Sequence, residues 1–170
     1  MAKISLVRLD SRLIHGQVIT KWVKIAKANR IIIIDDELSK DDFMVMIYAA
    51  AAPKNVSVEI ISVDKAAEEW EKDEFGTGTV MLLFKDVESC MRTAQKGVPI
   101  SSLQIGGIPN EPGRVTILRA VSLNQADMDL LEEMHQKGTE IYIHIIPEEP
   151  RMDFDKIKRT FEGCNTYNCP

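Results

Sequence analysis

The chain lacks the features of a membrane-spanning or secreted protein. No apolar run approaches the roughly 18 residues that a membrane span needs, and the N-terminal stretch MAKISLVRLD lacks the long apolar segment of a signal peptide. Only three cysteines occur, and no His or Cys cluster completes a metal site around Cys164 and Cys169. We therefore expect a cytoplasmic protein with no metal, in which Cys90, Cys164 and Cys169 are unpaired thiols.

An excess of basic residues is also absent. Lys and Arg number 21 against 26 Asp and Glu, a formal net charge of −5, whereas a nucleic-acid-binding protein shows a basic stripe. We expect no nucleic-acid partner. None of the motifs G-x-G-x-x-G, G-x-S-x-G or H-E-x-x-H occurs, and Gly106-Gly107 is not a P-loop because no Gly-Lys-Ser/Thr follows it.

Short apolar runs alternate with helical patterns along the chain. Ile31–Ile34 and Thr79–Phe84 are continuously apolar, which is typical of strands buried on both faces of a parallel sheet. The alternation predicts an α/β fold with an open, mostly parallel sheet of about six to seven strands, helices on both faces, and a single domain over residues 1–170. Other strands are expected over residues 4–8, 56–63, 103–105, 115–118 and 140–146, and helices over 17–28, 39–53, 64–71, 86–96, 124–138 and 153–161.

Specific residues should start and orient two of these helices. Ser39 is expected to cap the second helix, with Asp42 at the capping-box position, and Asp64 is expected to cap the third. The residues of the second helix that we expect to face the core are Phe43, Met46, Ile47 and Ala50.

The stretch RLDSRLIHGQV, residues 8–18, joins the first strand to the first helix. A helix N-terminus offers unpaired N–H groups and suits a phosphate. We interpret His15 as a nucleophile that accepts a phosphoryl group, Arg12 and Arg8 as a charge clamp, and Asp10 as the acceptor of the imidazole N–H. The same residues also fit a capping histidine beside a solvent-exposed ion pair.

Other residues are expected around this loop. Gly16 has no Cβ and allows the backbone to come close to a bound group. We expect Gly16 and Gln17 to bind or orient the phosphate. Loops at the carboxyl ends of parallel strands share one edge of the sheet. If the first strand lies beside strand 79–84, residues of both loops flank His15. The residues expected on this rim are Phe84, Lys85, Asp35, Gly106 and Gly107.

The segment D-x-R-L-I-H-G-Q-V resembles the IIB component of the mannose/fructose/sorbose family of the bacterial phosphotransferase system. The resemblance spans nearly the whole chain, through Trp22, the IIIIDD segment, the IGG segment at Ile105–Gly107 and the IIP segment at Ile145–Pro147. Ser11 departs from the family, which commonly carries a second aspartate there. The resemblance implies that His15 is phosphorylated, that Arg12 binds phosphate, and that Asp10 is the family's aspartate.

The resemblance also implies a reaction and its partners. A phosphorylated IIA protein gives its phosphoryl group to His15, which passes it to a sugar imported by the membrane IIC/IID complex. The chain is then a protein-N(pi)-phosphohistidine–sugar phosphotransferase without a permanent cofactor, cytoplasmic and peripherally associated with the permease. Because residue 1 begins almost at the first strand, we expect a IIB protein that is not fused to IIA. The sequence identifies no sugar, and a homodimer is compatible with it.

Two alternatives stay open. One is a stand-alone α/β phosphatase or nucleotide-using transferase that uses Asp35, Asp36 and His15 around a metal. The other is a non-catalytic regulatory homologue that binds the same partners without relaying phosphate. Turnover of a soluble phosphoester without a partner would favour the first, and partner binding without phosphate incorporation would favour the second.

Overall fold

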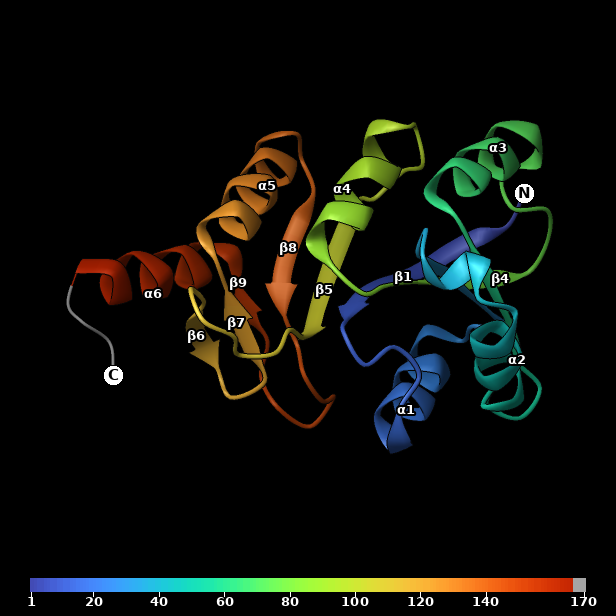
Figure 1. Cartoon of the computed structure of the whole chain (residues 1–170), viewed down its shortest axis with the longest axis horizontal. Coiled ribbons are helices and arrows are strands. Elements are labelled where there is room, and N and C mark those ends of the chain that lie inside the picture. Colours follow the sequence, from blue (N-terminus) through green and yellow to red (C-terminus); the bar gives the residue numbers. More distant parts are fainter. Residues whose placement is uncertain (167–170) are drawn as a thin grey trace.

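A mixed sheet forms the centre of the molecule (Figure 1). The computed structural model of this protein describes residues 1–166, without the side chains of residues 17, 18, 165 and 166. Within this range seven strands form one sheet, in which the first six in spatial order are parallel and the last pairs antiparallel. The order is β3 (Ser57–Ile61), β2 (Arg30–Ile34), β4 (Thr79–Phe84), β1 (Lys3–Asp10), β5 (Ser102–Gly107), β8 (Glu140–Ile143) and β9 (Met152–Asp153).

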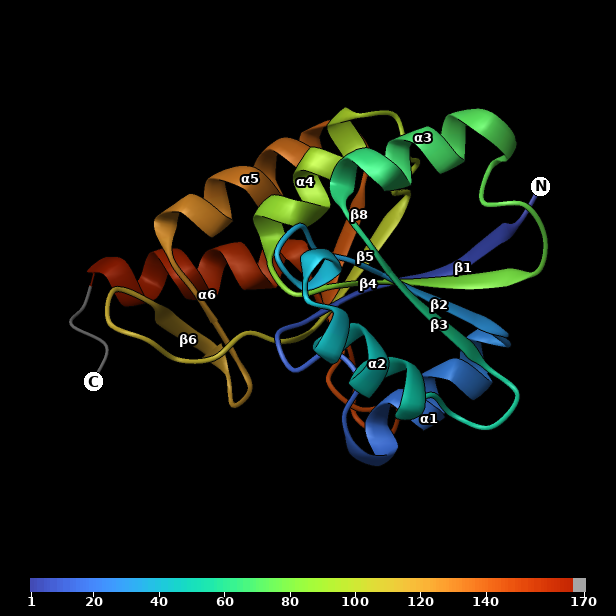
Figure 2. The same cartoon turned by 45° about the vertical axis from the view of Figure 1, so that its right-hand side comes forward.

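Helices cover both faces of the sheet (Figure 2). One face carries two helices, α1 (Gly16–Ala26) and α2 (Asp42–Ala50). The short 3-10 helix η1 (Leu38–Lys40) precedes α2. The opposite face carries α3 (Val63–Asp73), α4 (Val87–Gln95) and α5 (Gln125–Gln136). Beside β8 lie α6 (Phe154–Thr166) and a hairpin of β6 (Val115–Leu118) and β7 (Val121–Leu123). The predicted fold class is confirmed, whereas β7 and β9 were not predicted.

The continuous apolar runs are buried because the sheet has a hydrophobic layer on each face. Side chains alternate between the two faces of a strand. Ile32 and Ile34 of β2 enter one layer, Ile31 and Ile33 enter the other, and all four are 0% exposed. The first layer also includes Ala66 of α3, Cys90 of α4 and Leu131 of α5, and the second includes Ile19 and Val23 of α1.

Strand β1 lies between β4 and β5, which places its carboxyl end at the middle of one edge of the sheet. Leu9 is paired with Phe84 of β4, and Asp10 is paired with Gly107 of β5. The chain leaves β1 toward α1 on one face and leaves β4 toward α4 on the other face (Figure 2). Ligands of open α/β sheets bind where the connections of two neighbouring strands run to opposite faces of the sheet in this way. The predicted adjacency of the first strand and strand 79–84 is confirmed.

Two predicted helix starts are wrong. Asp41, not Ser39, caps α2 by accepting a backbone N–H at 3.1 Å, and Ser62, not Asp64, caps α3 at the same distance. In both places a second residue able to cap stands within two positions of the first. Capping preference alone does not choose between such neighbours, because the end of the preceding segment decides where the helix begins. At the start of α5, Asn124 is the cap and forms a complete capping box with Asp127.

The predicted core-facing side of α2 is also wrong. Phe43, Met46 and Ile47 are 64%, 61% and 40% exposed, and α2 buries no residue completely. Ala50 is exposed as well. The partly buried Tyr48 contacts the hydrophobic layer instead. Because residues 43–52 are all apolar, their periodicity does not select a buried face, and the position of α2 over the edge strands does.

The cysteines do not share one environment. Cys90 is a free thiol inside α4, as expected, and burial raises the pKa of this thiol. Cys164 is disulfide-bonded, so the expectation of an unpaired thiol is wrong for this residue, because composition reports on the compartment and not on local distances. Cys169 lies outside the described residues. No helix within residues 1–166 has both the length and the apolarity to cross a membrane.

Candidate functional site

Asp10 is the buried centre of the loop that follows β1. It is 0% exposed, and its carboxylate accepts hydrogen bonds from the Arg12 backbone N–H at 3.1 Å and from Arg12 Nε at 3.2 Å. His15 Nε2 lies 3.0 Å from Oδ2, and Arg8 Nη2 lies 3.4 Å from the same oxygen. Burial acts to raise the pKa of Asp10, but hydrogen bonds from Arg12 and His15 outweigh burial and hold this pKa below its ordinary value. Asp10 is therefore an ionised carboxylate at neutral pH.

The charge of Asp10 assigns the tautomer of His15. An ionised carboxylate can only accept hydrogen bonds, so Nε2 of His15 carries the proton in the 3.0 Å contact. The predicted hydrogen bond between these two residues is present. Nδ1 then holds the lone pair in the neutral ring and is the nucleophilic nitrogen. The His15 side chain is 22% exposed, so the imidazole ring is partly accessible from solvent.

The start of α1 and the guanidinium of Arg12 surround this histidine with positive potential. His15 is the N-cap of α1 and makes no side-chain cap bond, and the first turn of the helix contains no acidic residue. Gly16 has a φ of +51°, a conformation that favours glycine, and no atom lies within 4 Å of the place where its Cβ would stand. The Arg12 side chain is 51% exposed. An anion beside Nδ1 would therefore meet helix N–H groups and an accessible guanidinium. The backbone of Gln17 belongs to the first turn, and its side chain is not described.

Arg8 lies beneath the site and not on its surface. It is 1% exposed, and Nη1 donates to Gln104 Oε1 at 2.5 Å and to the His144 carbonyl at 2.9 Å. Nη2 donates to the Ile145 carbonyl at 3.1 Å, and the guanidinium lies 5.3 Å from the ring centre of Trp22. Desolvation lowers the pKa of Arg8 to about 10, which leaves it protonated at neutral pH. The geometry therefore makes Arg8 an orienting partner of Asp10 and excludes direct contact with a surface phosphate.

Gly106 and Gly107 make room for this network. A Cβ on Gly106 would stand 2.0 Å from Arg8 Nη2, and a Cβ on Gly107 would stand 2.9 Å from Asp10 Oδ1 and 3.2 Å from Arg12 Nη2. The Gly107 carbonyl also accepts the Ser11 N–H at 2.9 Å. The side chains of residues 8, 10 and 12 thus approach this glycine pair closely.

The other three rim residues have separate environments. Phe84 pairs with Leu9 and is 0% exposed, so it belongs to the core. Lys85 lines a shallow pocket of about 180 Å³ together with Ser11, next to the loop. Asp35 stands at the end of β2, which β4 separates from β1, and its carboxylate accepts the Leu38 N–H at 2.8 Å. Of these three, the structure brings only Lys85 to the accessible side of the loop.

The carboxylates required by the metal-dependent alternative are engaged elsewhere. Asp36 Oδ1 accepts the Val63 N–H at 2.9 Å, and Oδ2 lies 2.7 Å from Arg92 Nη1. The Val63 N–H is the largest cause of the lowered pKa of Asp36, and Arg92 adds to it. Across the part of the chain that the structure describes, no group of three His, Cys, Asp or Glu residues could hold a metal ion. Asp35 and Asp36 therefore connect β2 to the segments that follow and do not converge on His15.

The sequence reasoning missed the residues that hold Arg8. Gln104 is 1% exposed within β5, and a glutamine between apolar neighbours in a buried strand signals a partner, because buried polar groups are hydrogen-bonded. His144 alternates with apolar residues in the sequence, which is typical of a structural residue, and it packs edge-on against Trp22 with ring centres 4.8 Å apart. No sequence signal identifies the carbonyls of residues 144 and 145 as acceptors.

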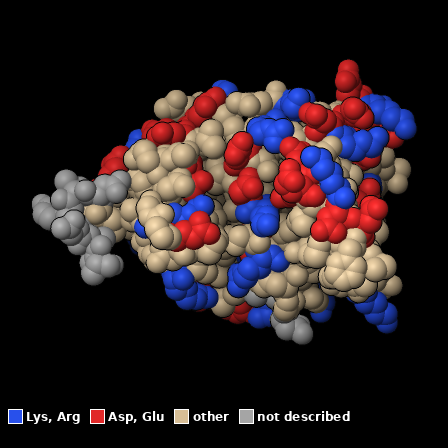
Figure 3. All heavy atoms as spheres, viewed as in Figure 1, with Lys and Arg blue, Asp and Glu red and all other residues tan. Residues whose placement is uncertain are grey.

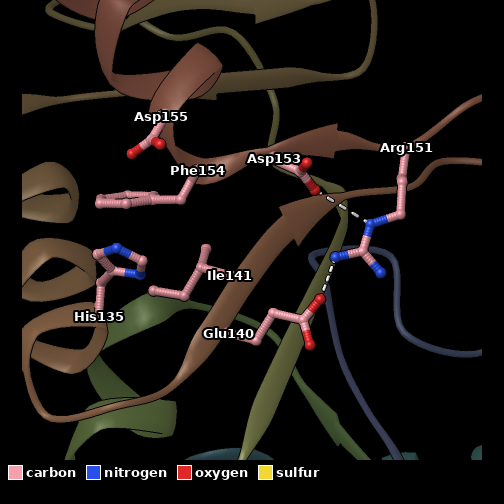
Figure 4. Close-up of a pocket in the computed structure, with 7 residues that line it drawn as sticks. All are labelled: His135, Glu140, Ile141, Arg151, Asp153, Phe154 and Asp155. Carbon is pink, nitrogen blue, oxygen red and sulfur yellow. Dashed lines mark hydrogen bonds and ion pairs between the residues drawn. The ribbon is translucent and has the colours of Figure 1, made fainter.

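A larger pocket lies away from this site. It has a volume of about 320 Å³, and in Figure 4 His135 faces Phe154 while Arg151 bridges Glu140 and Asp153. Arg151 thus pairs with two carboxylates of this pocket, and its guanidinium also stacks on Tyr142 at 3.8 Å from the ring centre. Glu140 begins β8, which is parallel to β5, so the pocket belongs to the opposite end of the strands from His15.

Comparisons with known proteins agree on one family. A sequence model of the family described as "PTS system sorbose subfamily IIB component" matches residues 4–165. The fructose-specific EIIB component of Bacillus subtilis is 33% identical over 94% of this chain and 98% of its own length. The IIBSor domain of the sorbose permease from Klebsiella pneumoniae is 34% identical with a TM-score of 0.87, over 93% of this chain and 98% of that one. The manxB structure from Thermoanaerobacter tengcongensis is 39% identical with a TM-score of 0.88, over 94% and 96%.

The close fit at Gly106 predicts that Gly106→Ala destabilises the protein. The new Cβ would displace the Arg8 guanidinium, which cannot move without losing buried hydrogen bonds, and overpacking of this kind costs about 1–3 kcal/mol. Urea unfolding at pH 7 measures the effect. The matched control is Gly163→Ala in α6, where the Cβ meets no atom within 4 Å and alanine is expected to stabilise the helix by up to about 1 kcal/mol. Equal effects of the two substitutions would contradict the prediction.

The lowered pKa of Asp10 predicts an acid-dependent contribution to stability. Because the folded-state pKa lies below the unfolded value of about 3.9, the contribution of ionised Asp10 is present above that value. It is lost as the pH falls through the folded-state pKa. The difference in unfolding free energy between wild type and Asp10→Asn should be about 1–3 kcal/mol at pH 7, steady down to about pH 5, and smaller below about pH 4. Urea titrations from pH 3 to 7 measure it, and a difference that grows toward acid would refute the assignment.

Proposed function

The chain belongs to the sorbose subfamily of IIB components of the phosphotransferase system, and we propose that His15 carries its phosphoryl group. IIB components are phosphotransferases, and this chain is a phosphocarrier of that system. The observation that supports His15 is its 3.0 Å hydrogen bond to Asp10 through Nε2, which leaves Nδ1, the N(pi) atom, as the nucleophile. We treat residues 1–170 as one IIB domain.

The first step is phosphoryl transfer from a phosphohistidine on the IIA partner. The lone pair of His15 Nδ1 attacks the phosphorus in line, a new N–P bond forms, and the N–P bond of the donor breaks. The electron pair of that bond returns to the donor nitrogen, and the donor ring, protonated at its other nitrogen, becomes a neutral imidazole. Since Nε2 of His15 keeps its proton, the phosphorylated ring becomes cationic, and ionised Asp10 stabilises this charge. Such transfers depend mainly on positioning and charge stabilisation.

Arg12 and the N-terminus of α1 act on the transferred group. The phosphoryl oxygens carry negative charge throughout the reaction, and a guanidinium binds two of them at once. Arg12 is held toward Asp10 by Nε and Nη2 while half of its side chain remains exposed. The free N–H groups of the first turn of α1 add donors on the other side. Arg8 contributes indirectly by holding Asp10.

The second step passes the group to a sugar held by the membrane IIC/IID complex. A sugar hydroxyl attacks phosphorus, an O–P bond forms, the N–P bond to His15 Nδ1 breaks, and the hydroxyl proton goes to a base of the permease. The chain needs no sugar pocket for this role, and selectivity then resides in the permease. This places the protein in the cytoplasm, where it associates with the permease at the membrane surface. The steps require no resident cofactor and no homodimer.

Replacement of His15 tests the proposal directly. His15→Ala should take up no phosphoryl group from phosphorylated IIA, whereas wild type should form an acid-labile phosphohistidine visible by ³¹P NMR. The matched control is His135→Ala, because His135 lies late in α5 beside Phe154 and should leave phosphorylation unchanged. Label that persists in His15→Ala would exclude His15 as the acceptor, and a wild type that binds IIA without incorporating phosphate would indicate the regulatory alternative.

Replacement of Arg12 separates chemistry from stability. Arg12→Ala should slow transfer from IIA by about 100-fold, the typical effect of removing one donor to a developing charge. It should lower the unfolding free energy by only about 1–2 kcal/mol, because buried Asp10 loses the Arg12 side-chain bonds but keeps the donors of His15, Arg8 and the Arg12 backbone. Rapid-quench kinetics measure the rate. The transfer rate of Arg12→Lys should be intermediate, since lysine keeps the positive charge but cannot bind two oxygens at once as a guanidinium does. Arg119→Ala, which removes an exposed arginine paired with Glu149, should transfer at the wild-type rate. A wild-type rate in Arg12→Ala would remove Arg12 from the mechanism.

A further inference from the structure

The apolar side of α2 has no partner within the described part of the chain. Met46 and Ile47 stand three and four positions after Phe43, so they lie on the same side of the helix as Phe43, and all three are exposed. We call these three residues the α2 face. Among the side chains that the structure describes, they make up three of the five large hydrophobic ones that are exposed, the others being Met1 and Ile25. A group of exposed apolar side chains on one helix marks an interaction surface more often than scattered single ones do.

The α2 face is directed so that a partner reaching His15 can also cover it. Helix α2 follows β2 and α1 follows β1, and these strands are both parallel to β4. Both helices therefore begin at the same edge of the sheet, and both lie on the same face of it (Figure 2). Phe43 is in the first turn of α2, and His15 caps α1. One protein surface placed across this edge meets the His15 loop and the start of α2 together.

The charges beside the α2 face indicate what kind of partner covers it. Asp41 and Asp42 are exposed at the start of the helix, and within residues 1–166 neither makes an ion pair with a described side chain. In Figure 3 the surface at the place of α2 is uncharged and has acidic side chains along one border. Cytoplasmic loops of membrane proteins carry an excess of Lys and Arg, which complements this border. An anionic lipid surface would repel it.

A second copy of the chain is less suited to cover the α2 face than a basic protein surface is. A stable protein interface buries roughly 800 Å² on each partner, which three side chains of one helix do not supply by themselves. A small apolar contact with an acidic border fits a transient complex instead, as a phosphocarrier needs, because it must leave one partner to meet the next.

We propose that the α2 face docks on the cytoplasmic loops of the membrane permease, into an apolar groove bordered by basic residues. The proposal rests on the proposed function for the identity of the permease, and adds a contact that the phosphoryl donor does not use. A carrier that presents the same histidine to two proteins needs at least one contact that distinguishes them. The α2 face supplies that contact for the permease, while IIA engages the His15 loop without it.

The test is a double substitution on the α2 face. Phe43→Gln with Met46→Gln removes apolar surface, adds no charge and keeps residues that favour a helix. The matched control is Ile25→Gln, which removes an exposed apolar side chain of α1 that is 58% exposed and outside the α2 face. Binding of the unphosphorylated chain to the IIC/IID complex in phosphatidylcholine nanodiscs is measured by biolayer interferometry, and phosphorylation by IIA is measured separately. The double variant should bind the permease at least 10-fold more weakly and accept phosphate from IIA within 2-fold of wild type.

The other results overturn the proposal in identifiable ways. Unchanged permease binding removes the α2 face from the interface, and an equal loss in Ile25→Gln shows a general surface effect. An equal loss of transfer from IIA assigns the face to the donor. Wild-type binding to protein-free phosphatidylglycerol nanodiscs assigns it to lipid, and a dimer in sedimentation that only the double variant loses assigns it to a second copy. If wild type accepts no phosphate yet binds the permease through α2, the proposed function fails and the docking face stands.

Discussion

The ionised carboxylate of Asp10, buried at the end of β1, is the constraint on which the site depends. A buried charge without partners destabilises a protein by several kcal/mol, so the carboxylate requires the donors that surround it. His15 and Arg12 provide two from the accessible side, and Arg8 provides a third from below. The same bonds that satisfy the charge set the tautomer of His15 and the direction of Arg12. Stability and orientation of the site thus arise from one set of contacts.

The sheet keeps this network rigid. Strand β1 is hydrogen-bonded on both sides, to β4 and β5, so the backbone of Asp10 cannot shift independently. Arg8 connects β1 to β5 through Gln104 and to the segment after β8 through two carbonyls. Gly106 lets the guanidinium pass close to β5. In phosphoryl transfer between two imidazoles, the protein contributes mainly the position of the reacting groups and the stabilisation of charge. Three parallel strands hold the site residues in fixed positions for this reaction.

The errors made from sequence have a common physical origin. The face of α2, its N-cap and that of α3, and the disulfide of Cys164 depend on which segment lies next to which. Where every residue of a helix after the first is apolar, as in α2, periodicity does not indicate which face is buried. Where two capping residues stand within two positions, propensity does not choose between them. Arg8 belongs to the same group, because an arginine beside Asp10 and Arg12 reads as a surface clamp until β5 and the segment after β8 cover it.

The sequence by itself determined the strands other than β7 and β9, the class of fold and the candidate histidine. Continuous apolar runs can be satisfied only between two covered faces of a sheet, and the loop after the first strand concentrates the chemically useful side chains. Tertiary structure alone decided that Asp10 is buried and charged, that His15 offers Nδ1, that Arg8 supports the site from below, and that the α2 face points outward. The place of Arg8 follows from contacts between residues about one hundred or more positions apart, which are its bonds with Gln104 and with the carbonyls of His144 and Ile145. Local sequence patterns do not encode such distances.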